Sequence, residues 1–291
     1  MNLITVGILA LVQSVTEFLP ISSSGHLVAV QRLLGLEDVP VSFNLILHLG
    51  TAAATLLVYH RLVGSLLKAL FLWPFRGSAG RQDQLRMAGY LAAATAVTAV
   101  VGFPLRDLIV SFFHRPEYLP FFYLATGCLL LGTRFTPASG GPGAGGSMPE
   151  DGRLEASDSI PGKPAEHMGL HRAVIVGTAQ AFAMLPGISR SGSTISAGLY
   201  LGVRRDSAAA FSFLLSLPAI LGASLAEYLL HGTPRGVHPA VLAWGFFLAL
   251  AAGYGALRLL LAFVRRGRLH LFAYYCFAAA GALIILAKAG W

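Results

Sequence analysis

The sequence predicts an all-α integral membrane protein: a polytopic helical bundle of two inverted-topology repeats, with about six full spans and two re-entrant helix hairpins. Three observations lead to this prediction. The 291 residues are 55% hydrophobic and only 12% charged, with a mean hydropathy of +0.68, which lies outside the range typical of soluble globular chains. Long windows are almost free of charge. Two polar Leu-Pro motifs of the same design interrupt them.

Six apolar windows are candidates for the full spans, because most of them, with their flanks, approach the roughly 20 residues that cross a hydrocarbon core. They are, in chain order, Phe43–Tyr59, Tyr90–Phe103, Phe121–Leu131, Phe211–Leu230, Val241–Leu261 and Leu271–Leu286. A cleavable signal peptide is not expected, since no basic region precedes the first apolar run. Cys128 and Cys276 lie within apolar windows and are expected to be small packing residues.

The two Leu-Pro motifs belong to a duplication that extends along the chain. Both motifs read Leu-Pro, then Ile-Ser, then Ser-Gly, around Pro20 in the first half and Pro186 in the second. A further matched pair follows: Phe43–Gly50 begins 23 residues after Pro20, and Phe211–Pro218 begins 25 residues after Pro186. The shared order and the near-equal spacing indicate two structural repeats.

The positions of Lys and Arg give each half an orientation, because positively charged loops stay on the cytoplasmic side of a membrane. Positive charge gathers in Arg61–Arg86, at Arg204 and Arg205, and from Arg265 to Arg268, whereas Arg106–Glu117 and His231–His238 carry less of it. Val41–His60 is therefore expected to run inwards and Ala208–Leu230 outwards, so that the two halves are inverted. The net charge of +8 is explained in the same way, and no basic run with interleaved aromatics indicates nucleic-acid binding.

Each Leu-Pro motif is expected to form the bend of a re-entrant hairpin, the first entering from outside and the second from inside. Leu3–Leu19 and Ile21–Leu34 are short for a full crossing, and Pro20 breaks the helix between them. Leu170–Leu185 and Ser189–Leu201 form the counterpart. Broken backbone is tolerated inside a bilayer only where protein or a water-filled cavity surrounds it. A polar site is therefore expected where the two bends meet.

These assignments divide the chain into three parts. They are repeat 1 over residues 1–135 with its hairpin at about 3–34, a cytoplasmic linker over 136–168, and repeat 2 over 169–291 with its hairpin at about 170–202. In each repeat, three full spans follow the hairpin. Pro137–Glu166 is rich in Gly, Pro, Ser and acidic residues, which is typical of a flexible linker without chemistry of its own.

Four side chains of the first motif suit acid–base and nucleophilic chemistry. Gln13 and Glu17 are four residues apart and share one helical face. Ser23 and His26 are three apart, which suits a serine nucleophile beside an imidazole that takes its proton, with Glu17 orienting the ring. Alternatively, His26 attacks phosphorus itself. In a purely structural role, Glu17 would close the turn through hydrogen bonds, although an ionisable residue at membrane depth is usually functional.

The helix starts of both motifs suit an anion. Ser22, Ser23 and Ser24 open the helix after Pro20, where one or two of them are expected to cap unsatisfied amides. The second helix start carries Ser189, Arg190, Ser191 and Gly192. Free amides and the helix dipole favour an anion there, and Arg190 adds a planar fork that matches phosphate oxygens. A solvated surface charge is the alternative for Arg190, but apolar helices flank it.

His48 is a further polar residue within an apolar window. The second repeat has Ser216 at the matching position, so His48 is interpreted as a hydrogen-bonded packing residue. The two hairpins are expected to converge, so that the imidazole of His26 and the guanidinium of Arg190 face the same phosphate-bearing ligand.

The two motifs together resemble the signature of the bacterial undecaprenyl-diphosphate phosphatase family, which is associated with bacitracin resistance. The residues that carry the resemblance are Gln13-Ser-Val-Thr-Glu17-Phe-Leu-Pro-Ile-Ser-Ser-Ser-Gly-His26 and Pro186-Gly-Ile-Ser-Arg190-Ser-Gly. The resemblance extends over nearly the whole chain apart from the linker. It implies a multi-pass enzyme of the bacterial inner membrane, opening towards the periplasm, that converts undecaprenyl diphosphate to undecaprenyl phosphate. That product is the lipid carrier for peptidoglycan and other envelope polymers.

The resemblance and the residues together assign roles within the site. Ser23, His26 and Glu17 are the candidate catalytic residues; Arg190, Ser189, Ser191, Gly192, Gln13, Ser22 and Ser24 are the candidate substrate-binding residues. The resemblance also implies a divalent cation, Mg²⁺ or Ca²⁺, with Glu17 as its ligand. The expected partner is a polyprenyl diphosphate lipid, and a homodimer is compatible with the sequence. Many family members carry Glu where this chain has Gln13, which leaves Glu17 as the principal acid.

Two other functions fit parts of the pattern. A secondary transporter or lipid flippase would also use inverted repeats and broken helices, although it has no evident need for Ser23 and His26 at this spacing. A structural membrane protein would use the small Gly and Ser residues for helix packing, but Glu17 and Arg190 would then be unexplained costs at membrane depth.

Overall fold

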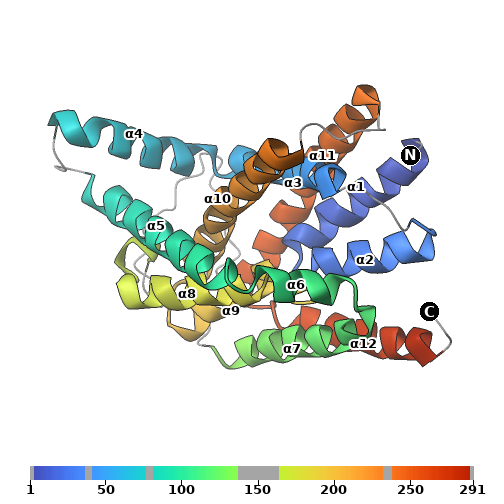
Figure 1. Cartoon of the computed structure of the whole chain (residues 1–291). Helices are drawn as coiled ribbons and strands as arrows, with labels where there is room; N and C mark the ends of the chain where they lie inside the picture. Colours follow the sequence, from blue (N-terminus) through green and yellow to red (C-terminus); the bar gives the residue numbers. More distant parts are fainter. Residues whose placement is uncertain (1–2, 37–40, 77–80, 137–163, 232–237, 289–291) are drawn as a thin grey trace.

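The chain is described by a computed structural model over residues 3–36, 41–76, 81–136, 164–231 and 238–288 (Figure 1). Within these ranges the structure is helical and contains no strand, which confirms the all-α prediction. Residues 137–163, which make up most of the expected linker, lie outside the described residues.

The described helices are as follows: α1 Leu3–Phe18, α2 Ser23–Leu33, α3 Val41–Val58, α4 His60–Arg76, α5 Gln82–Gly102, α6 Arg106–Phe113, α7 Leu119–Gly132, α8 Leu170–Phe182, α9 Arg190–Tyr200, α10 Arg205–His231, α11 Pro239–Arg265 and α12 Leu271–Lys288. Short 3₁₀ turns over Pro116–Tyr118, Thr133–Phe135 and Ala165–His167 extend α7 at both ends and precede α8.

Helices of membrane-spanning length and composition make this an integral membrane protein. In the part of the chain that is described, α5, α11, α12 and the Arg205–Ala226 portion of α10 qualify as spans. α3 and α4 provide a fifth if the pair is one broken span, since they meet at a bend of 83°. α7 has 14 residues and is about 21 Å long at 1.5 Å per residue, which is short for the roughly 30 Å core. Six full spans therefore remain a prediction.

Two segments expected to be loops are helical. α4 continues directly from α3 through the cytoplasmic-type segment that carries Arg61 and Lys68, and α6 lies in the segment assigned to the outer side. Both helices have one apolar and one polar face, which is the pattern of a helix that lies along an interface. Charge counting in these segments indicated their side of the membrane but could not indicate their conformation.

Both Leu-Pro motifs break a helix at the predicted place. α1 ends at Phe18 and α2 begins at Ser23, so that Pro20 lies in the turn between them. α8 ends at Phe182 and α9 begins at Arg190, with Gly187 in the turn at φ +94°. Glycine adopts this left-handed backbone without a steric penalty. In each pair the two helices contact one another, which gives two helical hairpins.

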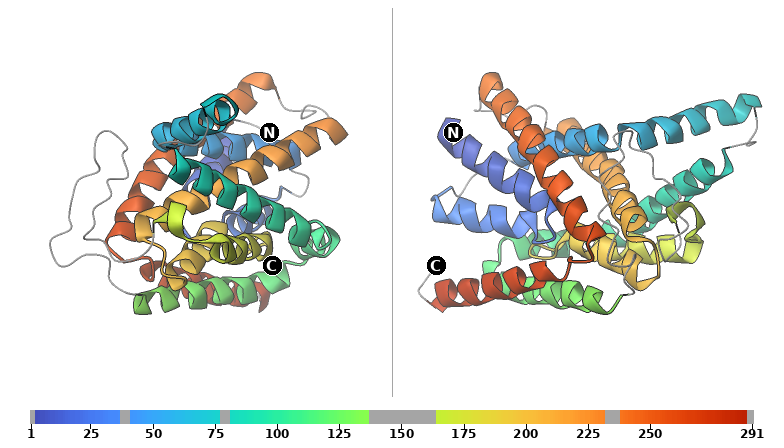
Figure 2. Two further views of the ribbon diagram at one scale, coloured as in Figure 1. Left: turned by 90° about the vertical axis from the view of Figure 1, so that its left-hand side faces the viewer. Right: turned by 180° about the vertical axis from the view of Figure 1, so that it is seen from behind.

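Helices of the two halves interlock. The most extensive contacts join α3 and α1 to α11, α7 to α12, and α5 to α8. Figure 1 and Figure 2 show α7 and α12 side by side at one edge of the molecule and α11 crossing α1 and α3 at the other. Because each half packs against the other, neither hairpin is supported by its own half alone.

Small residues allow this close approach. A Cβ atom on Gly177 of α8 would lie 2.8 Å from the Cα atom of Ala94 in α5. On the same contact, the hydroxyl of Thr98 donates a 2.9 Å hydrogen bond to the carbonyl oxygen of Gly177. Gly50 of α3 would likewise bring a Cβ within 2.6 Å of the Phe246 carbonyl oxygen in α11. Such contacts are typical of helices that pack within a membrane.

Candidate active site

The two hairpin turns present their helix starts in the same way. Ser22 caps α2 by accepting a hydrogen bond from the Gly25 amide at 3.3 Å, and Ser189 caps α9 by accepting one from the Gly192 amide at 3.0 Å. Ser22 holds a φ of +67°, which is uncommon for a residue with a side chain. Its hydroxyl also accepts a 3.1 Å hydrogen bond from the Gly187 amide in the opposite turn. The two turns are therefore in direct contact, as the sequence predicted.

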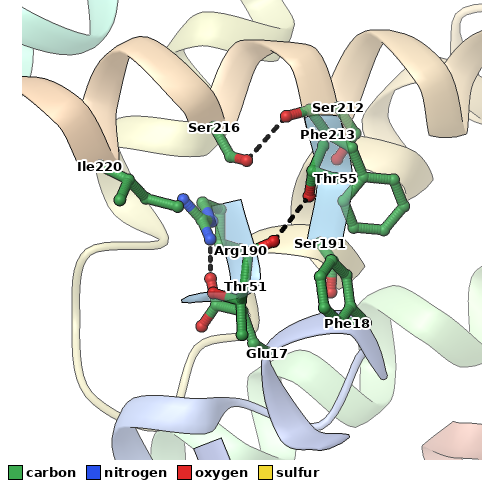
Figure 3. A pocket seen from close by; sticks show the side chains of 10 residues that line it. All are labelled: Glu17, Phe18, Thr51, Thr55, Arg190, Ser191, Ser212, Phe213, Ser216 and Ile220. Atoms are coloured by element: carbon green, nitrogen blue, oxygen red, sulfur yellow. Dashed lines mark hydrogen bonds and ion pairs between the residues drawn. The ribbon is translucent and has the colours of Figure 1, made fainter. Parts of the chain in front are cut away.

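Glu17 is the residue on which both hairpins converge. The hydroxyl of Ser23 donates to Glu17 Oε2 at 2.6 Å, and the amide of Gln13 donates to the same oxygen at 2.9 Å. Arg190 forms an ion pair with Glu17 Oε1, which crosses from the second hairpin to the first (Figure 3). Glu17 is buried, with 7% of its surface exposed. Its carboxylate is thus held by groups from α1, α2 and α9.

The ion pair balances two charges that would otherwise be costly at this depth. The Arg190 side chain is 23% exposed and the Glu17 side chain 5%. Both line a small pocket together with polar side chains of α3, α9 and α10 (Figure 3): Thr51, Thr55, Ser191, Ser212 and Ser216. With the pair closed, the pocket leaves room for about one water molecule. In this arrangement Arg190 Nη2 is already paired with Glu17.

Supporting hydroxyls fix the second turn. Thr126 of α7 accepts a 3.1 Å hydrogen bond from the Ser189 amide and donates one of the same length to the Gly187 carbonyl oxygen. The hydroxyls of Ser189 and Ser191 lie 3.3 Å apart. In the first turn, the hydroxyls of Ser22 and Ser24 have the same separation. These contacts hold the helix starts in place before any ligand is present.

His26 has different neighbours from those expected. Its Nδ1 lies 2.7 Å from the Ser22 carbonyl oxygen and 2.8 Å from the Tyr123 hydroxyl, and its Nε2 lies 2.6 Å from the Tyr275 hydroxyl. In the described contacts, Glu17 accepts a hydrogen bond from Ser23 and does not orient the ring of His26. The pocket beside Arg190 is not lined by His26. The two hairpin turns meet as predicted. However, the His26 imidazole does not line the pocket that the Arg190 guanidinium lines.

Three residues join the site that the sequence analysis did not place there. His48 Nδ1 lies 2.8 Å from Gln13 Nε2 and 3.5 Å from Glu17 Oε2, so its assignment as a packing residue was incomplete. The signal was available, since an ionisable ring at membrane depth is by default functional. Tyr123 and Tyr275 gave no such signal, because tyrosines are common in apolar helices and these two lie far from His26 in sequence.

Oxygen atoms near Glu17 suit a hard divalent cation that takes most of its ligands from substrate and water. Among the residues that the structure describes, no three His, Cys, Asp or Glu side chains gather as a metal site. Glu17 provides one carboxylate, and Gln13 Oε1 is buried without a hydrogen-bond partner among the residues described. Mg²⁺ is often held by one or two carboxylates together with phosphate oxygens and water. The residues present are therefore compatible with such an ion, although they would not hold it alone.

Comparison with known proteins identifies the family. The family model described as bacitracin resistance protein BacA matches residues 6–282, a range that includes both hairpin motifs. The chain belongs to this family. Membership confirms the resemblance seen in the two motifs, and it favours the phosphatase interpretation over the transporter.

Three curated relatives share one name. A protein of Treponema denticola named undecaprenyl-diphosphatase is 38% identical over 278 residues, covering 94% of each chain. Proteins of the same name from Desulfosudis oleivorans and Rhodopirellula baltica are 39% and 37% identical, covering 94% and 98% of each chain. The chain is thus similar to these BacA-family proteins along nearly its whole length.

Proposed function

We propose that this protein is an undecaprenyl-diphosphate phosphatase, which hydrolyses undecaprenyl diphosphate to undecaprenyl phosphate and inorganic phosphate and so recycles the lipid carrier for envelope polymers. One observation carries the proposal: in a chain of the BacA family, Ser23 and Arg190 from two separate hairpins meet on the buried carboxylate of Glu17. A hydroxyl, a carboxylate that can take its proton and a phosphate-binding cation are together suited to the transfer of a phosphoryl group from a phosphoanhydride.

Arg190 and the start of α9 would bind the terminal phosphate. Arginine is matched to phosphate oxygens by its planar fork, and the unsatisfied amides at a helix start favour an anion. In the free protein, the carboxylate of Glu17 is the anion that pairs with the guanidinium of Arg190. The diphosphate replaces Glu17 at Arg190, and Ser189, Ser191 and Gly192 provide the surrounding hydroxyl and amide groups.

Ser23 is the better supported nucleophile of the two alternatives. Its hydroxyl already donates to Glu17 at 2.6 Å, whereas both ring nitrogens of His26 are engaged elsewhere. In the first step, Ser23 Oγ forms a bond to the terminal phosphorus, the bond from phosphorus to the bridging oxygen breaks, and the Ser23 proton passes to Glu17. Undecaprenyl phosphate leaves as the product.

Water completes the cycle. Its oxygen attacks the phosphorus of the phosphoserine, the bond to Ser23 Oγ breaks, and a water proton passes to Nε2 of His26. Ser23 and His26 are three positions apart on α2, so both side chains lie on one face of the helix. Inorganic phosphate is then released, Glu17 returns its proton to Ser23, and His26 Nε2 gives the proton taken from water to the departing phosphate.

A divalent cation, Mg²⁺ or Ca²⁺, is part of the proposal. Glu17 Oε1, which Arg190 holds in the free protein, and Gln13 Oε1 are the oxygens that would hold it beside the substrate. When bound, the cation would neutralise charge on the diphosphate as the bridging oxygen leaves.

The proposed setting is the bacterial inner membrane, with the site opening towards the periplasm. Two inverted repeats, each with a re-entrant hairpin and three spans, would bring the hairpins together from opposite sides. The matching caps at Ser22 and Ser189 support the repeat. Exposed apolar side chains along α11 and α12 suit the prenyl tail and lipid, and the same surface would serve as the contact of a homodimer.

Phosphate release by the purified protein tests this function. Wild-type protein in detergent is given undecaprenyl diphosphate, with and without a chelator, beside Ser23→Ala and His26→Ala. Arg190→Ala is the third site variant. Arg258→Ala is its matched control, because Arg258 is an exposed arginine of α11. Loss of hydrolysis in the site variants but not in the control supports the proposal. A wild-type protein that releases no phosphate would favour the transporter instead.

A further inference from the structure

The imidazole of His26 is held at both nitrogens in the free protein. Nδ1 lies 2.7 Å from the carbonyl oxygen of Ser22, one helical turn earlier. A carbonyl oxygen can only accept, so we assign the ring proton to Nδ1, which shares it between the Ser22 carbonyl oxygen and the Tyr123 hydroxyl oxygen. The lone pair of the neutral ring is then on Nε2, which is the nitrogen that can take a proton.

Tyr275 occupies that lone pair. Its hydroxyl lies 2.6 Å from His26 Nε2, and since Nε2 has no proton, the phenol must donate. The two rings are stacked, with their centroids 5.6 Å apart and their planes at 17°. This contact joins α2 of the first hairpin to α12, near the other end of the chain.

Tyr123 and Tyr275 differ in how firmly they are held. Tyr123 is 2% exposed, and a Cβ on Gly25 would lie 2.7 Å from its hydroxyl, so it is tightly enclosed. Tyr275 is 45% exposed. Its side chain has room to turn, whereas that of Tyr123 does not.

We propose that Tyr275 is a substrate-binding residue that covers His26 Nε2 in the free enzyme and transfers its hydrogen bond to a phosphate oxygen when the diphosphate binds. This inference rests on the proposed function, in which His26 Nε2 must receive a proton from water. The nitrogen cannot do so while a phenol donates to it. A phosphate oxygen carries negative charge and is a stronger acceptor than a neutral imidazole, so substrate itself draws the hydroxyl away.

Tyr275→Phe tests the role of the hydroxyl alone, because it removes the hydroxyl and keeps the ring that stacks on His26. In the variant, the KM for undecaprenyl diphosphate is expected to rise about 3- to 30-fold. The complex loses a hydrogen bond to a charged phosphate oxygen, whereas the free enzyme loses only the weaker hydrogen bond to the neutral imidazole. The kcat is expected to stay within about threefold, because His26 Nε2 remains able to take a proton. A purely structural role would not produce this division between KM and kcat.

Chemical modification of His26 provides a measurement that is independent of activity. Diethyl pyrocarbonate reacts with an unprotonated, uncovered imidazole nitrogen, and peptide mass spectrometry reports each histidine separately. Loss of the Tyr275 hydroxyl is expected to speed labelling of His26 about 2- to 12-fold, the range that one neutral hydrogen bond allows. Tyr274→Phe is the matched control, since Tyr274 is the neighbouring exposed tyrosine of α12. Tyr123→Phe should also leave the rate unchanged, because Nε2 stays covered.

The unfolding temperatures of the three variants should equal that of the wild-type protein, which checks that the fold is intact. Faster labelling together with the raised KM in Tyr275→Phe alone supports the proposal, and either an unchanged labelling rate or an unchanged KM overturns it. Failure of the proposed function has a different signature. In that case wild-type protein releases no phosphate, whereas failure of this inference leaves wild-type hydrolysis intact and Tyr275→Phe identical to it.

Discussion

Ser23 and Arg190 occupy equivalent positions in the two hairpins and contact the same carboxylate. Each follows the capping serine of its helix by one residue, Ser22 in α2 and Ser189 in α9. Ser23 donates to Glu17 Oε2, and Arg190 pairs with Glu17 Oε1. The two helix starts thus place a hydroxyl and a cation on the two oxygens of one carboxylate. In the mechanism proposed above, one hairpin supplies the nucleophile and the other supplies the phosphate-binding group.

Arg190→Ala is expected to lower kcat/KM at least about 100-fold, because it removes the fork that binds the terminal phosphate. The variant also leaves Glu17 buried without its partner, which costs about 3 to 5 kcal/mol of stability for a buried pair. Phosphate release and the unfolding temperature measure the two effects. Arg258→Ala should change neither, and a fully active Arg190→Ala protein would contradict the assigned role.

Glu17→Gln is expected to abolish turnover while leaving substrate binding intact or tighter. The amide keeps the shape of the side chain but cannot accept the Ser23 proton, so kcat should fall by about 10²- to 10⁴-fold. Binding measured without divalent cation should not weaken, since Arg190 no longer has an internal anion to release. Competition of inorganic pyrophosphate with a labelled substrate measures the affinity. Weaker binding in this variant would show that Glu17 is not a competitor for Arg190.

Removal of divalent cations is expected to stop hydrolysis, and Mg²⁺ or Ca²⁺ should restore it. Gln13→Glu adds a second carboxylate beside Glu17, which strengthens a site for a hard cation. The cation concentration for half-maximal activity should therefore fall about 3- to 10-fold, while Glu17→Gln should raise the cation concentration needed in a binding assay. Chelator-resistant hydrolysis by the wild-type protein would remove the cation from the proposal.

His48→Ala is expected to reduce activity through Gln13. The imidazole accepts from Gln13 Nε2 at 2.8 Å and so fixes the amide that also donates to Glu17. Loss of one such contact weakens positioning by about 1 kcal/mol, or roughly fivefold in kcat/KM. His48→Gln retains an acceptor and should recover much of the activity. Equal losses in the two variants would indicate that His48 acts in some way other than as an acceptor for Gln13.

The breaks of the helices could be predicted from sequence because their causes are local. Pro20 and Gly187 act within one turn of the chain, and serine caps satisfy amides three residues away. The helical state of α4 and α6 could not be predicted in the same way, since the charge of a segment indicates its side of the membrane and not its conformation. The bend of 83° between α3 and α4 falls at Tyr59, where neither proline nor glycine marks a break.

The roles of the site residues illustrate the same limit. Residue spacing placed Ser23 and His26 on one face of α2, yet it could not indicate that Ser23 turns towards Glu17 while His26 turns towards Tyr275. That choice depends on α12, which contacts His26 only in the folded chain. His48 was visible as an unusual polar residue, but its bond to Gln13 arises from the packing of α3 beside α1.

The sequence by itself determined that this protein lies in a membrane, that its helices break at two duplicated motifs, and that one motif carries an acid and the other a cation. Composition, proline and residue spacing act over distances of a few residues, so they can be read from the chain. Only the tertiary structure decided that Glu17 joins Ser23 to Arg190 and that Tyr275 covers His26. These contacts depend on how helices from the two halves interlock, and no local pattern encodes the distance between side chains so far apart in sequence.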